Sequence, residues 1–170
     1  MPDTRAIIRA EGEGEAVWFN SDLFTFKCTS DETGHALTLF EERSQRGKAT
    51  PLHVHPEADE TFCVLDGEIL VHVDGVEQIV ASGGVAFVPR GTRHAIQVTS
   101  ATARMLTIVT PGYRALEMFF RDVGEPATEH ALPPSVPLPM EKIRAAATRL
   151  GSVVIVGPPP FPGSAVAHST

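Results

Sequence analysis

Short apolar or alternating stretches follow one another through most of the chain between residues 16 and 109. Such stretches, bounded by Gly, Pro, Asn, Asp or Ser, are typical of β-strands. They lie at residues 16–19, 23–28, 36–40, 61–65, 68–73, 77–80, 85–89, 94–98 and 104–109. Asp74-Gly75 separates two of them and predicts a tight hairpin, because this dipeptide tolerates positive φ angles. Many short strands at this spacing predict an all-β protein, either a sandwich or a closed barrel that hides its sheet edges.

Two helical patterns follow the strands. Apolar residues recur at helical spacing within residues 113–123 and again within 140–150, where the pattern ends at Gly151. The segment between them contains LPPSVPLP, which is too rich in proline for regular structure and predicts an extended connector.

The length of 170 residues fits a single domain that needs no disulfide to stabilise its core. We expect an N-terminal extension at residues 1–15 and a β-barrel domain at residues 16–125. Residues 126–170 would then hold the proline-rich connector, a C-terminal helix and a loose tail from Gly157 onward.

Composition and charge narrow the function classes. The formal net charge is -7 and Lys and Arg form no run, which argues against nucleic acid and anionic membranes as partners. No stretch has the length and hydropathy of a transmembrane helix or a signal-peptide core, so we expect a cytoplasmic protein. Cys28 and Cys63 lie in apolar surroundings without CxxC spacing, and we interpret them as reduced packing residues.

Candidate metal ligands gather in two stretches. His53 and His55 are two residues apart in an extended segment, so their imidazoles project from the same face. Glu60 follows the irregular segment PEAD, which can bring its carboxylate to the same side. His94 comes just after the turn residues of GGVAFVPRGTRH and could arrive from a neighbouring strand.

Three imidazoles and one carboxylate suit one divalent transition metal, such as iron, manganese, nickel, cobalt, copper or zinc. They suit calcium and magnesium poorly. A metal that accepts five or six ligands would keep positions open for a small-molecule substrate or O2. Glu57 and Asp59 lie near enough to serve as alternative ligands, but we interpret both as solvent-facing.

The same residues carry a resemblance to a known family. The first cupin motif is matched by Gly47, His53, His55, Glu60 and Gly67, and most of the second by Gly83, Pro89, Gly91 and His94. Val98 departs from the second motif, which usually ends in an Asn that is not a metal ligand. The chain thus resembles a single-domain cupin, and the resemblance implies a double-stranded β-helix (jelly-roll barrel) with short C-terminal helices.

Between residues 15 and 160 the chain is similar to the quercetinase-like cupins. This resemblance implies a metal-dependent dioxygenase that cleaves an aromatic or enolisable hydroxyl compound, such as a flavonol, with O2. It also implies that His53, His55, Glu60 and His94 hold the metal and that Glu60 is the catalytic base. A homodimer is expected from the family and from the two apolar helical stripes.

Other functions remain open at this stage. Cupins also include non-catalytic small-molecule binders, sensors and isomerases. An isomerase of sugars or acids would want a positive pocket, with Arg90, Arg93 or Arg104 facing inward. The aromatic candidates for a substrate pocket are Phe26, Phe40, Phe62 and Phe119, although core packing is the commoner role at such spacing.

Overall fold

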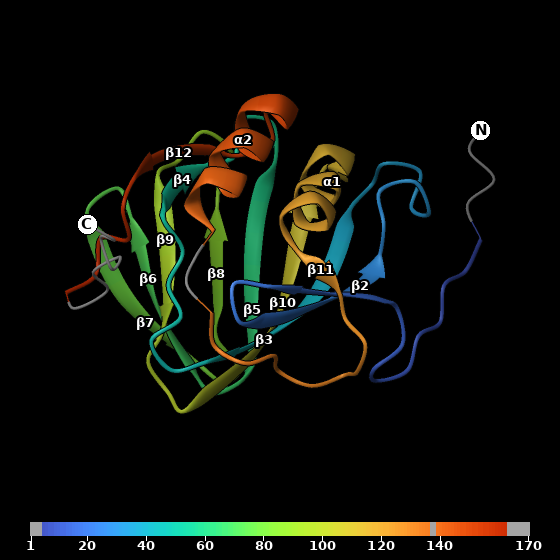
Figure 1. Ribbon diagram of the computed structural model, residues 1–170, viewed down its shortest axis with the longest axis horizontal. Coiled ribbons are helices and arrows are strands. Elements are labelled where there is room, and N and C mark those ends of the chain that lie inside the picture. The colour runs from blue at the N-terminus through green and yellow to red at the C-terminus, as the bar shows by residue number, and fades with distance from the viewer. Residues whose placement is uncertain (1–4, 137–138, 163–170) are drawn as a thin grey trace.

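Two antiparallel β-sheets pack face to face, and two helices cover one side of them (Figure 1). The computed structural model describes residues 5–136 and 139–162. The first sheet has seven strands in the order β11-β1-β2-β3-β10-β5-β8, and the second has five in the order β12-β4-β9-β6-β7. The predicted all-β class is therefore confirmed.

The strands of the first sheet are β1 (Glu15–Phe19), β2 (Asp22–Cys28), β3 (Thr38–Gln45), β5 (Asp59–Asp66), β8 (Val85–Val88), β10 (Thr102–Thr110) and β11 (Glu125–Pro126). Those of the second are β4 (Leu52–Val54), β6 (Glu68–Val73), β7 (Val76–Ala81), β9 (His94–Val98) and β12 (Val154–Gly157). Every apolar stretch found in the sequence overlaps one of these strands. The hydrogen-bonded ladders lie within each sheet, so closure into a continuous barrel, as expected from the sequence, is wrong for the described residues.

Strand β3 is longer than its apolar pattern. The sequence predicts a strand over residues 36–40, whereas β3 continues to Gln45 through five polar residues. On its outer face Glu41 accepts hydrogen bonds from Arg43 and Arg104, at 2.8 and 2.9 Å. On its inner face Glu42 and Ser44 are buried, so the strand places polar groups inside the protein.

Glycines stand at turns between the strands where the φ angle of the backbone is positive. The β6–β7 hairpin turns at Asp74 and Gly75, whose φ angles of 47° and 86° confirm the predicted tight turn. The four motif glycines, at positions 47, 67, 83 and 91, also have positive φ angles. At Gly67 a Cβ would come within 2.2 Å of the carbonyl oxygen of Thr102. The motif glycines are thus explained by backbone conformation.

The space between the two sheets is filled by one apolar cluster, which draws on β5, β8 and β10 from one sheet and β6 and β9 from the other. Val98, where the motif usually has Asn, is 1 % exposed in this cluster and pairs in register with Ile69. The departure from the motif therefore leaves the packing of β9 intact.

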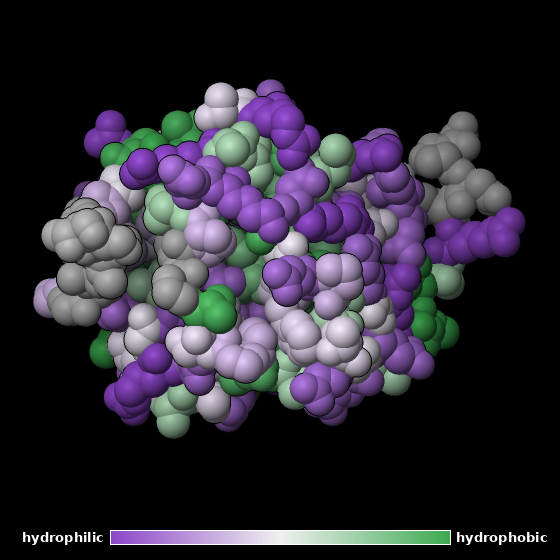
Figure 2. Space-filling model, in the orientation of Figure 1, coloured by the Kyte–Doolittle hydropathy of each residue, from purple (hydrophilic) through white to green (hydrophobic). Residues whose placement is uncertain are grey.

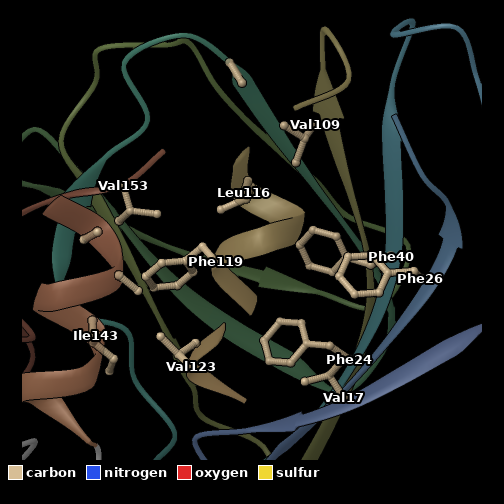
Figure 3. Packing of buried hydrophobic residues seen from close by; sticks show 13 residues of the cluster. Val17, Phe24, Phe26, Phe40, Val109, Leu116, Phe119, Val123, Ile143 and Val153 are labelled. Atoms are coloured by element: carbon tan, nitrogen blue, oxygen red, sulfur yellow. The ribbon is translucent and has the colours of Figure 1, made fainter. Parts of the chain in front are cut away.

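A second cluster joins the sheet to helices α1 (Arg114–Val123) and α2 (Met140–Leu150), as Figure 3 shows. Leu116 and Phe119 of α1 and Ile143 of α2 lie against the phenylalanines of β2 and β3. Both helices are where the sequence predicts them. Their apolar stripes pack inside the chain, and hydrophilic residues cover much of their outer side (Figure 2). The stripes are therefore no argument for a dimer.

The C-terminal segment packs more closely than the sequence suggests. Val154–Gly157 forms β12 on the edge strand β4, and Phe161 is 4 % exposed. The expected loose tail from Gly157 is thus wrong as far as Phe161, and residues 163–170 lie outside the described part. Neither described helix is long and apolar enough to span a membrane.

Candidate metal centre

Four side chains converge where the two sheets face each other. His53 lies in β4 and is paired in register with His94 at the start of β9, while His55 follows β4 directly. Glu60 comes from β5 in the other sheet. The ligand atoms of these four residues all lie within 4.8 Å of one another. The structure therefore brings together the four residues that the sequence indicates as metal ligands, and their cluster connects the sheets.

The backbone fixes the orientation of all three imidazoles. Nδ1 of His53 lies 2.8 Å from the carbonyl oxygen of Pro51, Nδ1 of His94 lies 3.0 Å from that of Thr92, and Nδ1 of His55 lies 2.9 Å from that of Ser152. A carbonyl oxygen can only accept, so each Nδ1 carries a hydrogen and donates it. In a neutral imidazole Nε2 then presents its lone pair, and a hydrogen bond of this kind commonly orients histidine ligands of metals.

The carboxylate of Glu60 favours a positive charge at the centre of the cluster. Its Oε2 lies 3.0 Å from Nε2 of His94 and 3.5 Å from Nε2 of His55. If those nitrogens present lone pairs, the buried carboxylate would face electron pairs rather than donors, which is unfavourable in a site that excludes water. A proton on an imidazole or a metal ion resolves this conflict. The donor set of three nitrogens and one carboxylate fits a divalent transition metal.

Burial and mutual charge set the protonation states. Burial, together with the neighbouring His94 and His55, holds the pKa of His53 well below 6.5, so His53 is neutral near pH 7. For His55, burial lowers the pKa but the Glu60 carboxylate outweighs it, and the net shift is upward. Burial raises the pKa of Glu60, but His55 and His94 lower that pKa by more than burial raises it, so Glu60 is ionised. Metal ligation requires an ionised carboxylate and neutral imidazoles.

A largely apolar cavity opens beside the cluster. Its lining includes His53, His55 and Glu60, and its empty space is about 660 Å³ including the open mouth. Most of the other lining residues are apolar side chains from the sheet strands and from α1, α2 and the segment after it: Phe19, Phe24, Phe40, Phe62, Ile96, Leu116, Phe119, Phe120, Ile143, Val153 and Ile155.

Three of the four phenylalanines proposed from the sequence line this cavity, namely Phe40, Phe62 and Phe119. Phe26 does not line it, because it packs in the helix-facing core under the Arg121 guanidinium, which lies 4.8 Å from its ring. Sequence periodicity could not separate these cases, since Phe26, Phe40 and Phe62 in the strands and Phe119 in α1 are all buried.

The charged neighbours of the motifs do not join the cluster. Glu57 is exposed, and Asp59 accepts hydrogen bonds at 2.9–3.0 Å from the backbone and guanidinium of Arg90. Arg104 is bound to Glu41, and Arg93 is exposed. None of these three arginines is among the residues that line the cavity. The positive pocket that an isomerase of sugars or acids would want is thus not built from them.

Sequence reasoning missed two ionisable residues of the cavity, Glu42 and Lys48. The inward alternation of Phe40, Glu42 and Ser44 was the available signal for the first. Lys48 directly follows Gly47 in the first motif, and nothing in its type or spacing indicates that it is buried. Both cysteines are free, as expected, and neither lines the cavity.

Comparison with known proteins places this geometry in a family. Residues 40–109 match the family model described as "Cupin domain". The chain contains a cupin domain. The matched residues include all four residues of the metal-ligand cluster and both motifs. A crystal structure of an RmlC-like cupin from Shewanella frigidimarina has the same fold, with a TM-score of 0.54, 19% identity, and coverage of 65% of this chain and 95% of that one.

Two curated relatives are both named quercetin 2,3-dioxygenase. The one from Bacillus subtilis is 30% identical over 123 residues, which are 72% of this chain and 36% of the relative. The one from Aspergillus japonicus is 25% identical over 138 residues, which are 77% of this chain and 39% of the relative. This cupin therefore resembles the quercetinase-like group, and it spans less than two fifths of the length of these relatives.

Proposed function

We propose that this cupin is a metal-dependent dioxygenase that cleaves an aromatic or enolisable hydroxyl compound of the flavonol type with O2. The observation that carries the proposal is the convergence of three backbone-oriented imidazoles and one ionised carboxylate at the wall of a phenylalanine-rich cavity. The names of the two curated relatives support the same reaction class.

In this proposal His53, His55, Glu60 and His94 hold one divalent transition metal. When bound, the metal supplies the electronic coupling that lets a closed-shell organic compound react with O2. The chain's own residues bind and orient the substrate. Phe40, Phe62 and Phe119 present faces and edges to an aromatic ring, and α1 and α2 limit the access of water to the cavity.

Glu60 is the proposed catalytic base. Its Oε2 is ionised, buried and next to the cavity, which are the properties needed to accept the proton of a substrate hydroxyl. This oxygen lies 3.0 Å from Nε2 of His94 and 3.5 Å from Nε2 of His55, which places the proposed base within the proposed ligand set.

Oxygen consumption tests this function. The purified chain is loaded in turn with iron, manganese, nickel, cobalt, copper and zinc, and O2 uptake is recorded with quercetin, with an anaerobic sample as the control. We expect uptake with at least one metal. Glu60→Gln at matched metal content should lower the rate by about 100-fold, since it removes the base. No uptake with any metal would refute the flavonol dioxygenase, and binding of quercetin without turnover would favour a binder or sensor.

A further inference from the structure

A second polar group is buried in the same cavity. The ammonium of Lys48 forms an ion pair with Asp22 and lies 3.9 Å from Oε1 of Glu42. The three side chains are 6 %, 0 % and 5 % exposed. Lys48 and Glu42 line the cavity, and the Lys48 nitrogen lies 5.9 and 5.8 Å from the ring centres of Phe19 and Phe24. We call Asp22, Glu42 and Lys48 the lysine cluster.

The lysine cluster lies away from the metal centre. Strand β10 runs between β3 and β5, and it pairs Met105 with Glu42 on one side and Val109 with Glu60 on the other. The backbones of Glu42 and Glu60 are therefore separated by the width of β10 and by four of its residues, about 13 Å along the strand. Their carboxylates are nearer, because Glu60 contributes to raising the pKa of Glu42. Phe40 and Phe62, which both pair with Thr107 between these two levels of β10, line the cavity. A ligand that contacts both groups would be a flat molecule with an oxygen at each end.

Unused hydrogen-bonding groups remain in the lysine cluster. Oε1 of Glu42 accepts a hydrogen bond from Ser44 at 3.2 Å. Oδ1 of Asp22 is buried and has no hydrogen-bond partner among the described residues. The ammonium of Lys48 has three donors and belongs to the lining of a largely apolar cavity. Buried polar groups without partners are costly unless a ligand or water satisfies them.

The charge of the lysine cluster limits what can bind there. Two carboxyl groups face one ammonium, and burial raises the pKa of Glu42 to about 8, so Glu42 is mostly a neutral acid near pH 7. Burial lowers the pKa of Lys48 to about 7. A ligand carboxylate or phosphate at this end would meet Asp22 with no surplus positive charge to hold it. A neutral hydroxyl or keto oxygen could accept from Lys48 and from protonated Glu42.

We infer that Lys48 and Glu42 form the specificity-determining end of the cavity and bind a neutral hydroxyl or keto group on an aromatic substrate whose other oxygen is at the metal centre. This inference depends on the proposed function only for the substrate oxygen that lies at the metal centre. It narrows the substrate class to neutral ring compounds with oxygen substituents at both ends, and it excludes aromatic carboxylates and phosphorylated sugars.

Equilibrium binding to the metal-loaded chain tests the inference without requiring turnover. Under anaerobic conditions, Kd is measured by calorimetry for the parent flavonol, which has no hydroxyl on its two outer rings, and for quercetin, which has hydroxyls on both. A third probe is a flavonol with a carboxylate in place of a ring hydroxyl. We expect quercetin to bind about tenfold more tightly than the parent flavonol, the value of one good hydrogen bond. The carboxylate should bind more weakly than quercetin.

Variants assign the effect to the lysine cluster. Glu42→Met and Lys48→Met each keep the approximate length of the side chain but remove its hydrogen-bonding groups, so both should abolish the preference for quercetin while leaving the affinity for the parent flavonol within about twofold. Lys142→Met, on the exposed side of α2, is the matched control and should keep the full preference. Metal content is measured for each variant, so that loss of the metal centre is distinguished from loss of the lysine cluster.

The outcomes separate this inference from the proposed function. Equal affinity of the wild-type chain for all three probes, or a preference that survives in Glu42→Met, overturns the specificity role. Tight binding of the carboxylate overturns the neutral class. A quercetin preference that depends on Glu42 and Lys48 supports the inference even where no O2 is consumed, in which case only the dioxygenase is lost.

Discussion

At the scale of single residues, the metal centre is set before any ion arrives. His53 and His94 each donate Nδ1–H to the backbone carbonyl two residues earlier, at Pro51 and Thr92. This local bond uses one nitrogen of each ring and leaves the other free for the ligand cluster, where Nε2 of His94 lies 3.0 Å from Oε2 of Glu60. Rings held in this way lose little freedom on binding a metal, so the affinity is not reduced by an ordering cost.

The affinity for the metal should depend on pH through His55. Glu60 raises the pKa of His55 above 6.5, so below that raised pKa a metal must displace a proton from it. The sign follows from linkage. In the metal-free chain the raised pKa stabilises the fold at pH values below 6.5, and this contribution is lost as the pH rises through the folded-state pKa. Metal binding, in contrast, becomes more favourable as the pH rises, because His55 then loses its proton.

We therefore expect the dissociation constant for zinc, measured by competition with a chromophoric chelator, to increase by up to about tenfold for each unit that the pH falls below that pKa. His35→Ala is the control, because His35 is exposed and bonded to Ser30, outside the cluster, and it should leave the slope unchanged. A dissociation constant that stays constant between about pH 5.5 and 7.5 would contradict the assignment of His55 as a ligand.

The four ligands could be predicted from the sequence because the information is local. Spacing of two places His53 and His55 on one face, and the turn before His94 sets the start of β9. The hydrogen bond that orients His55 could not be predicted, because its acceptor, the carbonyl of Ser152, is 97 residues away in the sequence. Lys48 could not be predicted either, because a lysine is normally on the surface and its burial depends on the meeting of β2 and β3.

At the scale of elements, the segment from α2 to β12 connects the cavity to the metal centre. Strand β12 lies beside β4 and pairs with it (Figure 1). Ile143 and Val153 line the cavity, and the carbonyl of Ser152 accepts a hydrogen bond from His55. Gly151 ends α2 with a φ angle of 67° and thereby turns the chain toward His55. The helix end is thus part of the site.

Gly151→Ala should weaken both the fold and the metal centre. A Cβ at Gly151 meets nothing within 4 Å, so the cost comes from the positive φ angle, about 1 to 2 kcal/mol of the free energy of unfolding. The shift of Ser152 should also reduce metal affinity by about tenfold. Urea unfolding and the same chelator competition measure the two effects.

Gly83→Ala is the matched control for this change. Its φ angle is 84°, its Cβ also meets nothing within 4 Å, and it precedes β8 at the end away from Glu60. It should cost similar stability and leave metal affinity unchanged. An equal loss of affinity in both variants would show that the Ser152 bond has no special role.

The elements themselves show where sequence patterns succeed and fail. Strands with an apolar inner face, such as β5 and β10, and both amphipathic helices are found from periodicity alone. Strand β3 is found only in part, because its inner face turns polar at Glu42 and Ser44 where it borders the cavity. A functional cavity replaces core residues by polar ones, and this removes the pattern that would reveal the strand.

At the scale of the whole molecule, the metal centre connects two sheets that share no hydrogen-bonded ladder in the described residues. His53 and His94 belong to the five-stranded sheet and Glu60 to the seven-stranded sheet. The apolar cluster between the sheets remains when the ligands are changed. The chain should therefore fold without a metal and gain stability when one binds. The expected homodimer stays a prediction, now without the support of the helical stripes.

Thermal unfolding measures this gain for the molecule as a whole. A ligand that binds only the folded state adds about 2.7 kcal/mol when present at 100 times its Kd, which for a chain of this length raises Tm by about 5 to 10 °C. We expect that shift between metal-loaded and chelator-treated wild type, and almost none in His53→Ala or His94→Ala. These variants should still unfold cooperatively, because the core clusters contain neither histidine. A Tm that rises equally in the variants would mean that the ion binds elsewhere, whereas variants that fail to fold without metal would mean that the core between the sheets is too small to hold them together. In the first case the dioxygenase proposal loses its metal centre, and in the second the cation is structural as well as functional.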